Sequence, residues 1–324
     1  MTRTHDDDDR SHVAAAVAVR NLRKTYPGGV EAVKGISFDV AAGEVFGLLG
    51  PNGAGKSTTI GMLTTTIAPT SGTATLAGYD VVAQPLQARG ISAVVFQEPV
   101  VDRMRTGRMN LATHARLWGL DTAAAQKRIE DLAAGFGLAG LLDRPVETYS
   151  GGERRRLEIA RALVSQPRVL FLDEPTVGLD TRIRYELMDV IEGLRSSEGM
   201  SIVLTTHYLD EAERLCDRVA IVHRGVVVAL DTPAALLASL GKQLVEVRVG
   251  TDGDRALTVL RRREVAGSDA FAVGATVTVP LHRTTATKVV AALDDEGVST
   301  ASVTTRVPTL DDVYLKLTGD RLAA

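Results

Sequence analysis

A glycine-rich loop is the segment of this chain whose residue types indicate chemistry most directly. Residues 50–57 read Gly-Pro-Asn-Gly-Ala-Gly-Lys-Ser, which fits the pattern GxxxxGK[ST], and they follow an apolar run at residues 45–49. Glycines allow backbone N–H groups to wrap phosphate oxygens, and the N-terminus of the following helix adds partial positive charge. Lys56 would neutralise the β- and γ-phosphates of a nucleotide, and the Ser57 hydroxyl would ligate Mg²⁺. The predicted phosphate site comprises Gly50, Pro51, Asn52, Gly53, Ala54, Gly55, Lys56, Ser57 and Thr58.

Two carboxylates end another apolar run of the chain. Asp173 and Glu174 follow residues 169–172, which read Val-Leu-Phe-Leu. Because buried carboxylates are costly unless a metal or a reaction uses them, Asp173 is expected to hold Mg²⁺, directly or through a water molecule. Glu174 is then expected to be the general base that polarises the attacking water. The alternative is a helix N-cap followed by an acid in the first turn.

Two more polar residues end predicted strands. His207 follows residues 202–206, and Gln97 follows residues 93–96. Ligands of parallel sheets bind beyond the carboxyl ends of the strands, so His207 is expected to donate a hydrogen bond to a γ-phosphate oxygen. Polar residues commonly close strands, which makes Gln97 the weaker candidate. Tyr26 precedes Pro-Gly-Gly and would either pack in a turn or stack on a base.

A second glycine pair, in the run Ser150-Gly151-Gly152-Glu153, lies far downstream of the phosphate loop. It has no obvious role within one folded chain, so we expect it to complete the site of another subunit. Ser150 and Glu153 also fit a capping box, in which each side chain bonds the backbone of the other residue and fixes the following helix. Both interpretations can hold together. The arginines at residues 154–156 would offset the charge of Glu153 or form a solvated helix face.

These residues require a sheet that brings strand ends together. Continuous apolar runs predict strands buried on both faces of a largely parallel sheet at residues 45–49, 169–172 and 202–204. Half-buried strands around the Pro-Gly-Gly turn predict an antiparallel ribbon at residues 18–25 and 35–40. The helical pattern between residues 104 and 163 predicts an inserted helical subdomain.

The composition of the chain changes near Gly241. Beyond it, strands that alternate apolar and polar side chains, as strands with one solvated face do, combine with helical patterns in the order β-α-β-β-α-β. This order predicts a small ferredoxin-like domain. The segments that define it are residues 244–249, 254–262, 275–279, 285–293 and 298–307, followed by a last helix at 310–317.

The overall composition is that of a globular protein, with 324 residues of which 45% are hydrophobic and 24% charged. The net charge of -3 gives no reason to expect nucleic acid as a ligand. A single cysteine, Cys216, fits a reducing, cytosolic setting and is expected to be a small buried residue in a helix. No apolar run reaches the roughly 18–20 residues of a membrane-spanning helix. The N-terminus lacks the apolar core of a secretory signal, and its acidic run Asp6 to Asp9 is expected to be solvated and disordered.

In their order and approximate spacing, the residues above resemble those of an ABC transporter ATP-binding subunit, over the first two-thirds of the chain. The resemblance implies an α/β fold of the P-loop NTPase class, with a mostly parallel sheet, an antiparallel β-subdomain and a helical subdomain. It implies that Tyr26 stacks on adenine and that Gln97 senses Mg²⁺ and faces a membrane partner. Asp180 would lie in a loop that crosses a dimer interface, and Ser150 and Gly152 would contact the γ-phosphate held by the opposite subunit. The resemblance rests on Tyr26, 50–57, Gln97, 150–153, Asp173, Glu174, 178–180 and His207.

The resemblance also implies a domain plan, cofactors and partners. A disordered acidic tail at residues 1–12 would precede an ABC ATP-binding domain at 13–240, with its helical subdomain at about 98–163, and a small C-terminal α+β accessory domain at 241–324. ATP and Mg²⁺ are the implied cofactors. The implied partners are a second copy, bound as a homodimer when ATP binds, and a separate integral membrane permease on the cytoplasmic side of the cell membrane. No nucleic acid is expected.

Two later segments, at residues 106–111 and 307–319, resemble ATP-binding subunits of the daunorubicin-resistance type of drug exporter. This implies ATP hydrolysis that powers export of a drug or another hydrophobic small molecule. The chain departs from the family pattern at Met109, where an acid is common, and at Glu153, where glutamine is more common. The alternative is a stand-alone ABC ATPase without a permease, regulatory or linked to nucleic acid. A chromosome ATPase would need a long heptad-bearing coiled coil, and a ribosome-associated ATPase would usually carry two cassettes; the sequence has neither.

Overall fold

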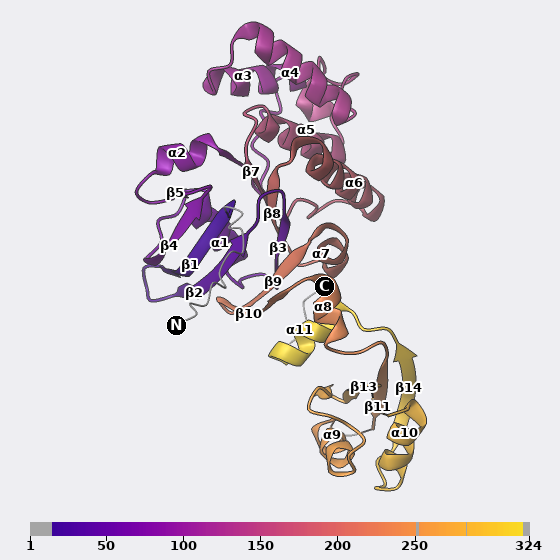
Figure 1. The fold of residues 1–324 in the computed structure, drawn as a ribbon. Coiled ribbons are helices and arrows are strands. Elements are labelled where there is room, and N and C mark those ends of the chain that lie inside the picture. Colours follow the sequence, from indigo (N-terminus) through magenta and orange to yellow (C-terminus); the bar gives the residue numbers. More distant parts are fainter. Residues whose placement is uncertain (1–14, 251–252, 283, 320–324) are drawn as a thin grey trace, which may run out of the picture. The chain divides into compact units, whose positions relative to one another are not determined.

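The computed structural model describes residues 15–250, 253–282 and 284–319 (Figure 1). The predicted acidic tail lies outside these residues. Contacts divide the chain into two compact units: the first runs to Phe46 and resumes over residues 55–205, and the second holds residues 47–54 and continues from Thr206. The residues of the phosphate loop are therefore divided between the two units.

An antiparallel sheet in the order β2-β1-β4-β5 forms one part of the first unit. Strand β1 (Val17–Thr25) pairs with β2 (Glu31–Val40) and β4 (Ser71–Leu76), and β4 pairs with the short β5 (Tyr79–Asp80). The predicted ribbon is confirmed. Strand β2 begins earlier than expected because its pairing with β1 continues through irregular positions as far as Glu31.

Three parallel strands of the first unit belong to a second, six-stranded sheet: β6 (Ser92–Val95), β7 (Val169–Asp173) and β8 (Ser201–Thr206). Every residue of β7 and β8 is buried, which confirms the interpretation of their continuous apolar runs. Strand β3 (Val45–Leu49) is equally buried and passes from the first unit into the second. The register of β7 and β8 places Asp173 opposite Thr205, at the carboxyl ends of the two strands.

Helices follow the sheet strands of the first unit. They are α1 (Lys56–Leu63), α2 (Pro85–Gly90), α3 (Gly107–Leu117), α4 (Thr122–Gly135), the 3₁₀ turn η1 (Val146–Thr148), α5 (Gly151–Leu163) and α6 (Thr181–Glu198). Side chains that accept backbone N–H bonds begin the four longest: Thr106, Asp121, Ser150 and Asp180. Within the described parts of the chain, no helix has the length and apolar character needed to cross a bilayer.

The second unit begins with a helix and a hairpin. Helix α7 (Leu209–Leu215) precedes the antiparallel strands β9 (Arg218–His223) and β10 (Val226–Asp231), and α8 (Pro233–Ala238) follows. Cys216 is buried as expected but lies one residue beyond α7, where its sulfur packs closely on Gly47.

The C-terminal part of the second unit is a four-stranded sheet with two helices. Its elements are β11 (Leu244–Val249), α9 (Gly253–Arg262), β12 (Phe271–Val273), β13 (Thr276–Pro280), α10 (Ala286–Asp294) and β14 (Thr300–Arg306). The sheet order is β12-β13-β11-β14. This order, with the chain order β-α-β-β-α-β, confirms the ferredoxin-like topology. Its core consists of valines of β11 and β13 packed on α9 and α10.

The last helix, α11 (Leu310–Thr318), contacts α7 and α8 as well as β12. It is therefore joined to elements that precede Gly241 in the sequence. The boundary expected at residue 241 stays a prediction, because the division into compact units falls at Thr205 and Thr206 instead.

Candidate functional site

Lys56 and Glu174 form a buried ion pair in the first unit. Lys56 Nζ lies 3.1 Å from Glu174 Oε1, and the two side chains are only 4% and 6% exposed. The lysine is the first residue of α1, and the glutamate directly follows β7. Two charges are stable in such a place only when they are paired with each other or with a ligand. The structure therefore joins the predicted phosphate-binding lysine to the predicted general base.

Asp173, Ser57 and Thr205 form a cluster of oxygen atoms beside this pair. Asp173 Oδ1 accepts hydrogen bonds from Ser57 Oγ at 3.1 Å and from Thr205 Oγ1 at 2.6 Å. Within the described residues, no group of three or more His, Cys, Asp or Glu side chains has metal-binding geometry. Mg²⁺ characteristically binds one or two protein oxygens together with substrate phosphates, so the hydroxyl of Ser57 and the carboxylate of Asp173 fit this ion.

Glu174 has a strained backbone. Its φ of 45° lies in the left-handed region, which is unfavourable for residues other than glycine, and its N–H donates to Thr205 Oγ1 at 2.9 Å. Strain of this kind concentrates at functional sites, where the surrounding structure enforces it. Thr205 thus bonds both carboxylate residues. It was missed in the sequence, although its hydroxyl at a predicted strand end was a usable signal.

The first part of the phosphate loop packs within the second unit. Gly50 N–H donates to Thr206 O at 3.3 Å, and Ala54 O accepts from Gly225 N–H at 3.0 Å. A Cβ atom on Gly50 would overlap Val222 O, so only glycine fits at this position. The loop therefore starts beside the end of β8, where His207 follows.

Gly55, at the N-terminus of α1, also requires glycine. Its φ is 104°, and a Cβ atom there would lie 2.5 Å from Ala32 O. Tyr26 is close by in the first unit: its hydroxyl lies 3.5 Å from Thr58 Oγ1, and Lys24 Nζ is 5.2 Å from the centre of its ring. The ring is thus next to the phosphate-loop helix, as a base-stacking role requires, and that role stays a prediction.

The capping box predicted at the second glycine pair is present. Ser150 N–H donates to Glu153 Oε2 at 2.7 Å, and Glu153 N–H donates to Ser150 Oγ at 3.2 Å. The hydrogen bond from the Ser150 backbone is the main cause that lowers the pKa of Glu153 below its ordinary value. Ser150 and Gly151 are exposed, so they are accessible to a second chain.

Gly152 and Asp180 fix the approach of α5 to α6. Gly152 is buried, and a Cβ atom on it would overlap Ile183 Cγ2. Asp180 accepts a hydrogen bond from Ile183 N–H at 3.0 Å and caps α6. Both residues therefore have roles inside one chain, and their contacts across a dimer interface stay predictions.

Arg155 is the main residue whose role the sequence did not predict. We expected a solvated arginine face or a charge that offsets Glu153, but Arg155 is 7% exposed. Its guanidinium donates to Pro175 O and Phe96 O, each at 2.7 Å, and pairs with Glu158 at 2.9 Å. It thereby fastens α5 to the segments that follow β6 and β7. The solvated-face interpretation is wrong for Arg155. The carbonyl oxygens of Phe96 and Pro175 need a hydrogen-bond donor, and the buried Arg155 guanidinium supplies it.

Gln97 and His207 occupy the predicted strand ends. Gln97 follows β6 in the first unit and its side chain is exposed. His207 follows β8 in the second unit, and its ring lies 4.2 Å from that of Tyr208, centre to centre. Their functions toward Mg²⁺ and phosphate stay predictions.

Comparison with known proteins places this site in a family. The profile of the ABC transporter family matches residues 33–177, from β2 to just beyond Glu174. The daunorubicin/doxorubicin resistance ATP-binding protein DrrA of Streptomyces peucetius is 41% identical over 94% of this chain and 92% of its own. The chain belongs to the ABC transporter ATP-binding proteins.

Further relatives show the breadth of the ABC ATPase family. The Nod factor export ATP-binding protein I of Paraburkholderia xenovorans is 39% identical over 79% of this chain and 85% of its own. Among solved structures, cbiO1 of Clostridium perfringens, part of an ABC transporter complex, has a TM-score of 0.65 and 29% identity over 69% of this chain and 91% of its own. MJ0796, solved as a dimer with ADP and Pi, has a TM-score of 0.61 at 24% identity over 67% of this chain and 98% of its own, which supports the fold. The ABC ATPase described here is thus an ATP-hydrolysing subunit of α/β P-loop fold.

Proposed function

We propose that this ABC ATPase powers export of a drug or another hydrophobic small molecule through a separate membrane permease. The buried pair of Lys56 and Glu174 carries the ATPase part of the proposal, because it joins a phosphate-binding cation to a general base. The relatives that match nearly the whole chain support the export part, since their names describe resistance to daunorubicin and doxorubicin.

Hydrolysis would begin with an exchange of partners at Lys56. The γ-phosphate of ATP would bind the ammonium group of Lys56 and displace the carboxylate of Glu174 from it. The released carboxylate would then accept a proton from the attacking water. Mg²⁺ held by Ser57 and Asp173 would neutralise charge on the phosphate oxygens. Thr205 would keep both carboxylate residues in place through its two hydrogen bonds.

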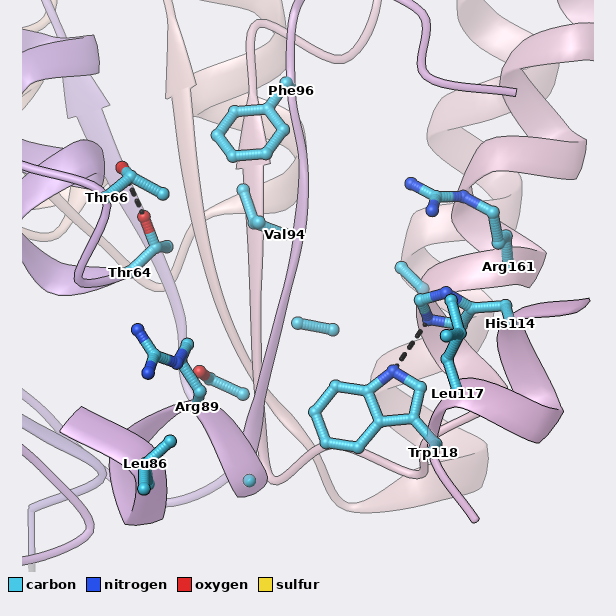
Figure 2. A pocket seen from close by; sticks show the side chains of 14 residues that line it. Thr64, Thr66, Leu86, Arg89, Val94, Phe96, His114, Leu117, Trp118 and Arg161 are labelled. Carbon is cyan, nitrogen blue, oxygen red and sulfur yellow. Dashed lines mark hydrogen bonds between the residues drawn. The ribbon is translucent and has the colours of Figure 1, made fainter. Parts of the chain in front are cut away.

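The permease would dock at a cavity of about 560 Å³ in the first unit (Figure 2). Helices α2, α3 and α5 and strand β6 contribute its walls. The apolar side chains include Leu86, Val94, Phe96, Leu117 and Trp118. Leu86 and Leu117 are 72% and 79% exposed, and exposed apolar side chains that gather around one cavity mark a site for a partner.

The charges of this cavity favour an acidic occupant. Arg89 and Arg161 lie on opposite sides of it in Figure 2, and none of the described residues that line it is acidic. Burial lowers the pKa of Arg161, whose Nε atom is buried and has no hydrogen-bond partner among the described residues. We infer that a permease segment inserts an apolar side chain and presents a carboxylate to these guanidinium groups.

His114 keeps this cavity from gaining a further positive charge. Its pKa is lowered to about 4, first by burial and then by Arg161, so the ring is neutral at physiological pH. Its Nε2 accepts a hydrogen bond from Trp118 Nε1 at 3.0 Å, which holds the tryptophan at the cavity wall.

Co-expression with a candidate permease tests the proposal. The permease should copurify with the chain and stimulate its ATP hydrolysis. Arg161→Gln should weaken copurification while the chain alone hydrolyses ATP normally, and Arg182→Gln, at a highly exposed position of α6, serves as the matched control. Absence of stimulation by any membrane subunit would favour the stand-alone alternative. Normal copurification of the Arg161 variant would reject the proposed docking site but not the proposed export function.

A further inference from the structure

Helix α11 is hydrogen-bonded to the β9–β10 hairpin, and this hairpin contacts the phosphate loop. Tyr314 of α11 is fully buried, at 0% exposure, and its hydroxyl lies 2.7 Å from Nδ1 of His223. The two rings meet edge to face, with centres 5.8 Å apart and an interplanar angle of 69°. A buried tyrosine hydroxyl needs a hydrogen-bond partner, so His223 and Tyr314 hold each other in place.

His223 is the last residue of β9 and opens the tight turn to β10. Arg224 and Gly225 form this turn with φ angles of 47° and 85°, and His223 pairs with Val226 across it. Such two-residue turns with two left-handed residues have a defined geometry. The position of His223 therefore fixes where the Gly225 N–H points.

The Gly225 N–H points at the phosphate loop. It donates to Ala54 O at 3.0 Å, directly before the glycine and lysine that open α1. At the other end of the loop, Gly50 packs so tightly on Val222 O that no Cβ atom fits. Strand β9 and its turn thus hold the phosphate loop at two points, and Tyr314 supports that strand end from the side of α11.

Helix α11 is in turn bonded to the ferredoxin-like sheet. Arg306 at the end of β14 donates to Asp312 at 2.6 Å and to Glu246 of β11 at 3.0 Å. Burial opposes ionisation of Asp312, but its hydrogen bonds with Arg306 keep its pKa below the ordinary value. The N–H of Leu310 also donates to Glu213 of α7 at 3.2 Å. A displacement of the C-terminal sheet would therefore move α11 and, with it, Tyr314.

We propose that Tyr314 and His223 are positioning residues for the phosphate loop, through which the C-terminal sheet sets the affinity of this ABC ATPase for ATP. Neither residue touches the nucleotide. Their contact orients the turn at Arg224 and Gly225, and this turn places the backbone of Ala54, which belongs to the loop that wraps the phosphates. The C-terminal sheet thereby acquires a role in the nucleotide site.

Tyr314→Phe is the direct test, because it keeps the buried ring and removes only the hydroxyl. The net contribution of one hydrogen bond corresponds to an affinity change of about three- to fivefold. We expect the Kd and KM for ATP of the full-length chain to rise by this factor while kcat stays within about twofold. Tyr185→Phe, in an exposed position of α6, is the matched control and should leave all three values unchanged.

A double-mutant cycle separates positioning from general destabilisation. His223→Val should raise the Kd for ATP as Tyr314→Phe does, the double variant should be no weaker than either single variant, and His223→Asn, which can still bond the tyrosine, should restore most of the affinity. A fall in melting temperature with unchanged Kd and KM would overturn the proposal. Additive effects of the two substitutions on the Kd would overturn it as well.

Discussion

Thr205 shows how a single hydroxyl can organise the chemistry of this site. It donates to Asp173 and accepts from the backbone of Glu174, whose left-handed conformation is strained by about 1–3 kcal/mol. The two carboxylates were predictable from the sequence because they end a buried apolar run. The bond to Thr205 was not, because it joins strands that lie far apart in the chain and depends on their register.

Thr205→Val should therefore impair catalysis at nearly constant side-chain shape. The substitution leaves the buried N–H of Glu174 without this partner and removes one of the two hydrogen bonds to Asp173 Oδ1, so the free energy of unfolding should fall by roughly 1–3 kcal/mol. We expect kcat to fall more than tenfold, with a smaller change in the Kd for ATP. Denaturant unfolding and steady-state kinetics measure both effects. Thr278→Val, at a buried position in β13, is the control that should leave kcat unchanged. A Thr205 variant with normal kcat would contradict this role.

At the scale of elements, α5 combines a folding signal with a functional surface. Its capping box was predictable because both partners are local in sequence, and the same holds for the strands, whose apolar runs match their burial. The burial of Arg155 was not predictable, since its acceptors follow two other strands. The packing of α11 on α7 and α8 was equally hidden, because sequence order groups α11 with the C-terminal sheet.

The capping box gives α5 a pH-dependent contribution to stability. The folded chain lowers the pKa of Glu153 from its ordinary value of 4.5, so the contribution of its charge is present above pH 4.5 and is lost as the pH falls through the folded pKa. Glu153→Gln should fold normally and change ATP affinity modestly. The difference in unfolding free energy between this variant and the wild type should shrink below pH 4.5. A constant difference down to pH 3, or a collapse of stability at pH 7, would contradict this account.

At the scale of the whole molecule, two copies would combine their sites when ATP binds. Ser150 and Gly151 are exposed at the start of α5, where a phosphate held by another chain could reach the helix N-terminus. The free N–H groups of the first turn and the dipole of this helix would then stabilise the bound γ-phosphate. Each site would need the phosphate loop of one chain and the second glycine pair of the other.

Mixed dimers test this sharing. Ser150→Arg would block the site whose Lys56 belongs to the opposite chain, whereas Lys56→Ala would disable the site of its own chain. A dimer with both changes in one chain should lose activity at both of its sites. A dimer with one change in each chain should keep one intact site. The ATP turnover of the two purified heterodimers measures the difference. If both heterodimers lose the same share of their turnover, the sites are not shared between chains.

We infer that Glu174, paired with Lys56, is the base of an ATP-hydrolysing site. Glu174→Gln removes the proton acceptor and keeps the shape of the side chain. A single-turnover assay with the purified Glu174→Gln chain tests this role, with ATP binding determined on the same sample. We predict ATP binding close to that of the wild type and hydrolysis slower by about 10²–10⁴-fold. Hydrolysis at the wild-type rate would contradict it.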